Sequence, residues 1–152
     1  MSYTAAEGRQ QILDALASAA DAAGQALAEL SEAYEHLDER TAERLEEALF
    51  GPAQAAYGRA KRTHAAFAER YDMPQRAFES AAQVAPSTAA AELIQRAVAA
   101  ADRADAELAE LQDSMLPVEV GDAELRAGIA EVRELVGRLR PAARQLQRTL
   151  GR

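Results

Sequence analysis

Cysteine and tryptophan are absent from this 152-residue chain, and aromatic residues make up 5% of it. Without cysteine the protein has no disulfide, no thiol nucleophile and no thiolate metal ligand. This absence suits a reducing compartment, so we predict a cytoplasmic protein. No stretch approaches the ~18 apolar residues of a transmembrane helix, so we expect no membrane interaction. The first residues, MSYTAAEGRQQ, show no basic segment followed by an apolar one, so a signal peptide is not expected.

Histidine occurs twice, as His36 and His64. A di-iron site in a helical bundle needs a Glu-x-x-His motif on two helices, but Ala33 and Lys61 stand three residues before the two histidines. The chain also has no Walker motif, no glycine-rich phosphate loop and no metalloprotease motif. The acidic residues between 102 and 113 lack the spacing and the glycine of an EF-hand. We therefore predict a protein that is not an enzyme, with no cofactor and no metal.

Alanine is the abundant residue, with 39 copies. It is the best helix former, and no strand-like alternation is visible, so the chain is predicted to be all-α. Because alanine buries little apolar area, and hydrophobic stabilisation scales with that area, the helices must pack closely or pair with another chain. Sixteen of the 17 basic residues are arginine, which together with the alanine content indicates a GC-rich bacterial genome.

Leucine and alanine recur at alternating steps of three and four residues, the spacing of a heptad seam. This pattern predicts one domain over residues 1–152, an antiparallel up-down-up-down four-helix bundle. Thr4, Asp38, Ser87 and Asp122 are the expected N-caps. The helices are predicted at about 4–37, 39–71, 87–116 and 122–151, with a long connection over 72–86 that Phe78 and Val84 pin to the bundle.

The boundary between the first two helices has two solutions. The chain can turn at Leu37–Thr41, or the first helix can run on to Phe50. The turn gives helices of matched length, which bury apolar surface better, and is preferred. Pro52 then falls inside the second helix, and Pro141 falls inside the fourth. Each removes a hydrogen bond and clashes with the preceding turn, so a kink is predicted at both.

Charge alternates along the chain. Residues 1–50 carry a net charge of −8, residues 51–77 +3, residues 78–124 −8 and residues 125–152 +5. In the predicted arrangement each acidic helix has basic neighbours, and this pattern can select one arrangement against alternatives. The overall charge of −8 and the lack of aromatic residues in the last helix argue against nucleic-acid binding.

Several basic residues are candidates for contact with a partner. We expect most of them to face the acidic first and third helices or solvent, and a recognition surface for an acidic partner is the alternative. The candidates are Arg59, Lys61 and Arg62 in the second helix, and Arg140, Arg144 and Arg148 in the fourth.

The two histidines have different expected environments. His64 lies on the seam of the second helix, and we predict a buried polar group with one hydrogen bond, to Tyr34 or to a backbone group. His36 lies one turn after Glu32, which predicts a solvent-exposed acid–imidazole pair.

The predicted function is that of a non-enzymatic helical interaction or scaffold protein, which self-associates, for example as a homodimer, or binds a helical protein partner. One alternative is a bundle that binds a small apolar ligand, with His64 as the polar group of its pocket. The seams and the absence of a catalytic constellation favour the interaction protein.

A second alternative is a secretion-associated helical hairpin. Residues 7–71 resemble the small WXG-type hairpins that dedicated bacterial systems export. Phe50-Gly51 stands where those hairpins have Trp-x-Gly, but the Trp and the spacer are both missing and the chain has two further helices. A turn at Leu37–Thr41 would remove this correspondence, and the family is not assigned.

Overall fold

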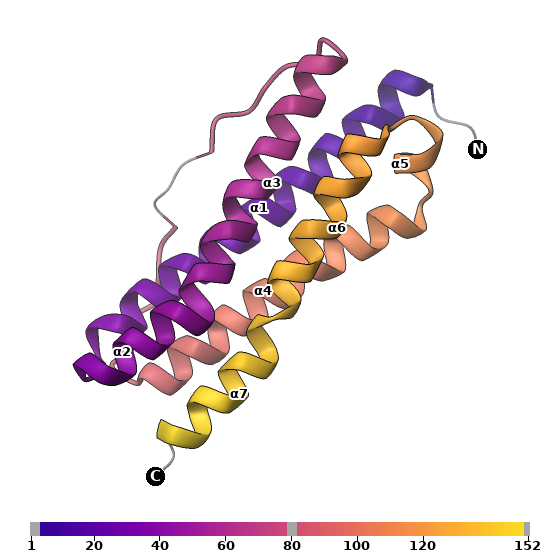
Figure 1. Cartoon of the computed structure of the whole chain (residues 1–152). Helices are drawn as coiled ribbons and strands as arrows, with labels where there is room; N and C mark the ends of the chain where they lie inside the picture. Colours follow the sequence, from indigo (N-terminus) through magenta and orange to yellow (C-terminus); the bar gives the residue numbers. More distant parts are fainter. Residues whose placement is uncertain (1–3, 79–81, 151–152) are drawn as a thin grey trace.

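The protein is an all-α four-helix bundle. The computed structural model describes residues 4–78 and 82–150, and these contain helices and no strand. Four rods make up the bundle (Figure 1). The first rod is α1 (Ala5–Glu35), and the second is the continuous run of α2 (Glu39–Leu45), the π-helical turn η1 (Glu46–Phe50) and α3 (Gly51–Arg70). The third rod is α4 (Ala90–Asp113), and the fourth is α6 (Ala123–Gly137) followed by α7 (Leu139–Leu150). The short α5 (Leu116–Glu119) lies between the third and fourth rods.

Three of the four predicted N-caps are confirmed. Thr4, Asp38 and Asp122 each accept a hydrogen bond from the backbone N–H three residues on, at 3.1, 2.8 and 2.8 Å. Ser87 is not a cap, because α4 begins at Ala90. Its hydroxyl accepts from the Ala89 N–H and donates to Glu92, so it acts within the connection ahead of the helix.

The first helix ends at the predicted turn. α1 stops at Glu35, and Asp38 caps the next helix. The alternative of an unbroken helix to Phe50 is therefore wrong. The Asp38 side chain also accepts from the Thr41 hydroxyl at 3.1 Å, so a local polar pair fixes a boundary that contains neither glycine nor proline.

Both internal prolines lie where the regular hydrogen bonding changes. Ahead of Pro52 the helix widens into η1, and the Gly51 N–H donates to the Glu46 carbonyl five residues back. A π-helical turn of this kind accommodates an insertion or a missing donor within a continuous helix. In the fourth rod α6 ends at Gly137 and α7 begins at Leu139, so Pro141 lies in the first turn of α7. The predicted bends of the helix axes stay predictions.

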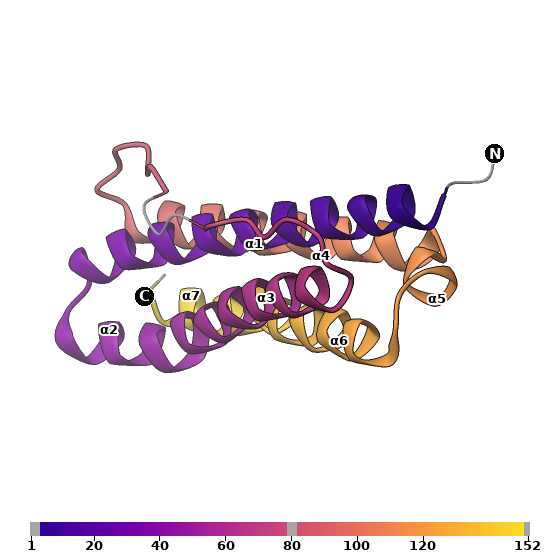
Figure 2. The ribbon, with the colours of Figure 1, turned by 90° about the horizontal axis from the view of Figure 1, so that it is seen from above.

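The order of helix directions differs from the predicted up-down-up-down order. α3 and α4 run in the same direction, because the connection between them returns along the length of the bundle (Figures 1 and 2). Contacts at the helix ends agree: Glu29 near the end of α1 lies against Arg96 near the start of α4. Nineteen residues, 71–89, separate the two helices. At about 3.3 Å per extended residue they can span either arrangement.

Each rod is antiparallel to both of its neighbours. α1 packs against α3 and α4, and α6 packs against α3 and α4. The order around the bundle is therefore first, second, fourth, third. This corrects the predicted charge arrangement, because the two acid-rich rods α1 and α4 lie side by side.

α1 and α4 pack against each other, and both carry many buried alanines, among them Ala19, Ala20, Ala23 and Ala26 on α1 and Ala97, Ala100, Ala101 and Ala104 on α4. Large side chains are fully buried on all four rods, for example Ile12 on α1, Phe67 on α3, Ile94 on α4 and Ile129 on α6. Phe78 and Val84 of the connection pack against this core, as predicted.

Two seam residues are exposed instead of buried. Tyr34 is 40% exposed near the end of α1, and Met115 is 49% exposed. Met115 has a left-handed backbone (φ 66°) just after α4, which turns it out of the seam. The short α5 lies between the predicted third and fourth helices, with Pro117 in its first turn.

Candidate functional site

Two adjoining hollows run along the contact between α1 and α4, and together we call them the acidic groove. The first has a volume of about 320 Å³ and the second about 520 Å³, and they share Glu107. The charged residues that line the groove are Asp14, Asp21 and Glu29 from α1 and Arg96, Arg103, Glu107 and Glu110 from α4.

The first hollow carries negative charge without local compensation. Asp14, Glu107 and Glu110 line it, and no basic side chain does. Within the described part of the chain none of the three forms an ion pair, and Asp14 accepts a hydrogen bond from Gln10 at 2.9 Å. Carboxylates gathered in a hollow with low-dielectric walls focus a negative potential that attracts cations.

The second hollow contains a buried carboxylate. Glu29 is 5% exposed, and its Oε1 accepts a hydrogen bond from Gln25 Nε2 at 3.1 Å. Its Oε2 is buried and has no hydrogen-bond partner. The nearest cation is Arg96, with Nη1 at 3.8 Å from Oε2, beyond hydrogen-bond distance. Arg96 instead donates to Glu92 at 2.9 Å and to the Ala85 carbonyl at 2.8 Å.

The connection, described over residues 71–78 and 82–89, borders this hollow, and we call it the strap. Figure 2 shows it crossing α1 on its way back to the start of α4. Arg76 pairs with Asp21 at 2.9 Å, and Gln25 donates to the Gln83 carbonyl at 3.0 Å. The strap thus supplies carbonyl groups and one guanidinium to the edge of the acidic groove.

His64 is buried beneath the strap, as a seam position predicts. It is 3% exposed, and the Phe78 ring meets its imidazole edge-on at 5.3 Å between centroids. Its Nδ1 has no hydrogen-bond partner, so the predicted bond to Tyr34, which is exposed, is wrong. Burial lowers the pKa of His64, and the nearby Arg76 lowers it further, against an opposing effect of Asp14. His64 lines neither hollow of the groove, so a pocket built around it stays a prediction.

The His64 environment predicts a pH dependence of stability. Its pKa is lower in the folded chain than the 6.5 of an unfolded histidine, so the unfolded state binds a proton more readily. The free energy of unfolding therefore has its full value above about pH 6.5, and it decreases as the pH falls below 6.5 and through the lower pKa of folded His64. Urea unfolding at pH 7.5 and pH 5.5 measures this loss. In the His64→Leu variant the loss shrinks, whereas His36→Leu, at the exposed histidine, keeps it. Equal losses in His64→Leu and wild type would contradict the assignment.

The basic candidates on α3 lie on different sides of the helix: Arg59 faces the fourth rod, Lys61 lies over the Tyr57 ring, which packs against Gly24 of α1, and Arg62 faces solvent. Arg59 pairs with Glu131 of α6 at 2.6 Å, which corrects the expectation that it faces the first or third helix. Lys61 lies 4.0 Å above the Tyr57 ring. Arg62 is exposed and its guanidinium lies over Gly58. Their contact with a partner stays a prediction.

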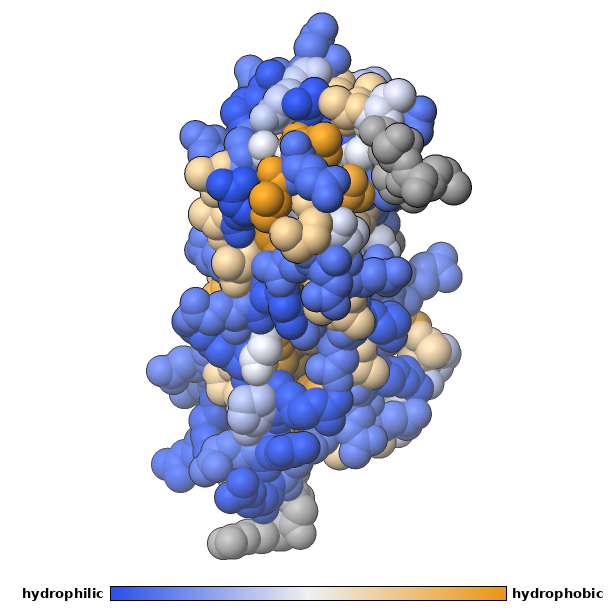
Figure 3. Space-filling view, turned by 90° about the vertical axis from the view of Figure 1, so that its right-hand side faces the viewer, coloured by the Kyte–Doolittle hydropathy of each residue, from blue (hydrophilic) through white to orange (hydrophobic). Residues whose placement is uncertain are grey.

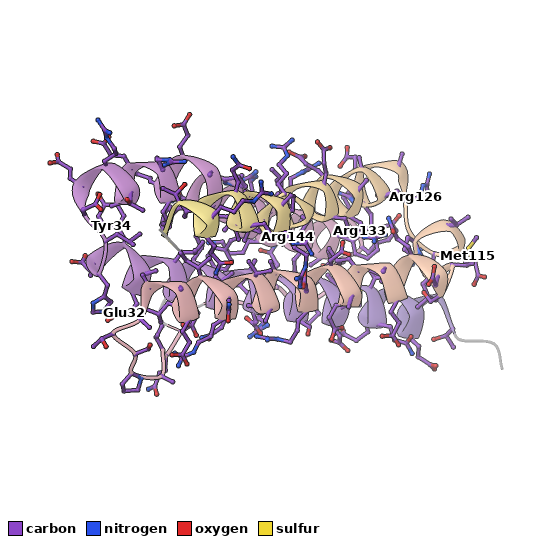
Figure 4. The ribbon with its side chains drawn as sticks, turned by 90° about the horizontal axis from the view of Figure 1, so that it is seen from below. Glu32, Tyr34, Met115, Arg126, Arg133 and Arg144 are labelled. Atoms are coloured by element: carbon purple, nitrogen blue, oxygen red, sulfur yellow. The ribbon has the colours of Figure 1, made fainter. Side chains whose placement is uncertain are left out.

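The candidates in the fourth rod divide into two groups. Arg140 pairs with Asp102 of α4. Arg144 and Arg148 are exposed and form no ion pair within residues 4–78 and 82–150. Figure 4 shows Arg133 and Arg144 along the α6–α7 rod beside α4. Arg133, which is not among the candidates for partner contact, donates to Asp105 through Nε and Nη2 and to Gln112 through Nη1.

The other expectations concern metals and the hairpin. His36 and Glu32 form the predicted exposed pair, at 3.2 Å.

In the described ranges no group of three His, Asp or Glu residues is placed to hold a metal ion. Phe50-Gly51 lies within the continuous second rod and not at a turn, so the correspondence to the WXG-type turn is lost.

A second surface feature is a small apolar patch at the opposite end of the bundle from Tyr34 (Figure 4). Met115 and Val118 are 49% and 58% exposed. Figure 3 shows hydrophobic residues gathered on the upper part of the face that it presents, with hydrophilic residues over most of the rest.

In comparisons with known proteins, no family model, no curated protein and no solved structure matches this chain. None of the helices in the described residues is long enough and apolar enough to cross a membrane.

Proposed function

We propose that the protein is a non-enzymatic interaction module whose acidic groove binds a basic helical segment of a partner protein. One observation carries this proposal: Asp14, Glu107 and Glu110 meet in one hollow without an opposing charge. Like charges are unfavourable when they are held together, and a cationic partner relieves that cost. Complementary charge of this kind contributes to association rate and specificity more than to affinity.

The shape of the groove favours a helix as the partner element. It follows the contact of two antiparallel rods from Leu116 past Glu107 to Glu29. The part of α1 between Asp14 and Glu29 is about 22 Å long at 1.5 Å per residue. A partner helix of about four turns covers that length, with Lys or Arg recurring every three or four residues on the side that faces the groove.

A second copy of the chain is a less suitable occupant. Its exposed cations Arg144 and Arg148 lie on α7, which is a different surface from the groove between α1 and α4. Contact between two different surfaces is head-to-tail and extends into open chains unless the rotation closes. We therefore favour a different protein over the homodimer considered above, and light scattering of the protein alone tests this choice.

A defined peptide tests the groove. The probe is an alanine-based helical peptide of about 18 residues with Lys at every fourth position, and fluorescence anisotropy at low salt measures its binding. In the test variant Asp14, Glu107 and Glu110 are all changed to Lys. In the control variant the exposed Glu35, Glu43 and Glu47 are changed to Lys, which alters the net charge equally at the other end of the bundle.

We expect the test variant to lose peptide binding by about a hundredfold, and the control variant to lose much less. Binding to wild type is expected to weaken steeply with added salt, because exposed charges are screened beyond about 10 Å at 0.1 M. Equal losses in the two variants would show a general charge effect and contradict the groove. Absence of binding to wild type at low salt would contradict the proposal as a whole.

A further inference from the structure

We propose that the hollow at Glu29 receives one primary ammonium group, supplied by a lysine of the basic segment. This inference rests on the proposed function and names the anchor of the partner within it. The hollow is lined by Ser18, Gln25 and Glu29 and bordered by the strap.

The buried carboxylate of Glu29 is incompletely paired. A carboxylate removed from water is costly unless hydrogen bonds and an opposite charge compensate it. Glu29 is 5% exposed, yet its Oε2 accepts no hydrogen bond. A donor that enters the hollow and reaches Oε2 would complete the coordination of this carboxylate.

Arg96 cannot serve as that donor while it keeps its own partners. Its Nη1 donates to the Ala85 carbonyl and its Nη2 donates to Glu92. The bond to Ala85 ties α4 to the strap, the bond to Glu92 lies within α4, and Nη1 stays 3.8 Å from Glu29 Oε2. Moving Arg96 onto Glu29 would break contacts that already fix the strap.

The charge around the hollow favours a cation. Among the residues that the structure describes, four carboxylates, those of Asp21, Glu29, Glu92 and Glu107, lie in or beside the hollow, and so do the three guanidinium groups of Arg76, Arg96 and Arg103. These groups sum to one negative charge, which a single monovalent cation neutralises. An anionic ligand would add to the excess.

The geometry selects an ammonium over a guanidinium. Guanidinium binds carboxylates best through two parallel hydrogen bonds to both oxygens. Gln25 already donates to Glu29 Oε1, so the buried Oε2 is the one carboxylate oxygen without a hydrogen-bond partner. A compact ammonium needs a single strong acceptor and can direct its remaining protons to nearby oxygens, and the Ser18 hydroxyl lines the same hollow.

Two probes test the anchor. n-Butylammonium is titrated into the protein while NMR follows the side-chain amide of Gln25, which donates to both Glu29 and the Gln83 carbonyl. n-Butylguanidinium serves as the comparison. The variant is Glu29→Gln, and the control is Glu32→Gln on the same helix, whose carboxylate is exposed. Urea unfolding confirms that both variants are folded.

We expect a saturable shift of the Gln25 amide with n-butylammonium in wild type and Glu32→Gln, a weaker response to n-butylguanidinium, and loss of the response in Glu29→Gln. The lysine peptide of the previous section is expected to bind Glu29→Gln at least about tenfold more weakly. An unsaturable response in wild type, or the same shift in Glu29→Gln, would overturn the anchor.

The two proposals fail differently. If the peptide binds and the Asp14, Glu107 and Glu110 reversal abolishes binding, but Glu29→Gln binds as wild type does, the anchor is wrong and the proposed function stands. If the peptide does not bind wild type but n-butylammonium does, the proposed function is wrong and the hollow remains a site for small amines.

Discussion

Replacing Gly128 by alanine is expected to destabilise the bundle by about 2–3 kcal/mol. Gly128 is buried on α6, where it faces Thr63 of α3. A Cβ at position 128 would lie 2.4 Å from Thr63 Oγ1 and 2.6 Å from its Cγ2. Alanine is a better helix former than glycine by about 1 kcal/mol, so a net loss would show that the close contact of the two rods dominates.

Two further variants separate packing from helix propensity. Thr63→Ala removes the two closest atoms and is expected to recover most of the loss in the double variant, which a double-mutant cycle measures. Gly137→Ala is the matched control, because its added Cβ would meet nothing within 4 Å. It is expected to stabilise by up to about 1 kcal/mol. If Gly128→Ala stabilises the protein equally, the close contact of α3 and α6 is wrong.

Replacing Asp122 by alanine is expected to cost about 2–3 kcal/mol. Its carboxylate caps α6 through the Leu125 N–H, binds Arg70 through two hydrogen bonds of 2.8 Å, and accepts from the Tyr71 hydroxyl at 3.2 Å. The cap contributes about 1 kcal/mol, and the partly exposed ion pair contributes up to about another. One side chain thus joins the end of α3 to the start of α6.

Acid unfolding checks the Asp122 assignment. Burial alone would raise the pKa of Asp122, but the hydrogen bonds from Arg70, Leu125 and Tyr71 outweigh it and the pKa falls below 3.8. The stabilisation is present above about pH 3.8 and is lost as the pH falls through the folded pKa. Glu124→Ala is the control, because Glu124 is exposed and contacts the same Arg70 through one bond. Equal effects of Asp122→Ala and Glu124→Ala at pH 7 would contradict this role.

Local features of the fold follow from local sequence. Thr4, Asp38 and Asp122 cap the starts of their helices through bonds to residues three positions away, and such bonds depend on neighbours along the chain. The heptad spacing also places the buried face of each rod. Met115 departs from it because the chain turns there, and the residue takes a left-handed conformation that its spacing does not show.

The order of the rods could not be read from charge. The strap is long enough to return to either end of the bundle, so length does not decide the direction of α4. Exposed ion pairs contribute about 0–1 kcal/mol each, and in this chain they do not keep the acidic rods apart. The alanine faces of α1 and α4 pack closely and bury apolar surface, while their carboxylates remain at the rim of the contact.

The acidic groove depends on that order. Asp14 and Glu107 are 93 positions apart, and they meet because α1 and α4 are neighbours. The burial of Glu29 is indicated by its spacing in the sequence, because it lies three residues after Ala26 and four before Ala33, both of which are buried. A charged residue at the spacing of a buried face indicates a site that the core alone does not explain.

The distance between α1 and the start of α4 tests the arrangement most directly. The chain has no native cysteine, so spin labels can be placed at chosen positions and measured by double electron–electron resonance. With labels at Glu32→Cys and Gln95→Cys, the antiparallel packing of α1 and α4 predicts a short distance between the labels, below about 20 Å. With Gln10→Cys and Gln95→Cys it predicts roughly 30 Å. A long first distance and a short second one would place α4 parallel to α1, and would contradict both the order of the rods and the acidic groove built on it.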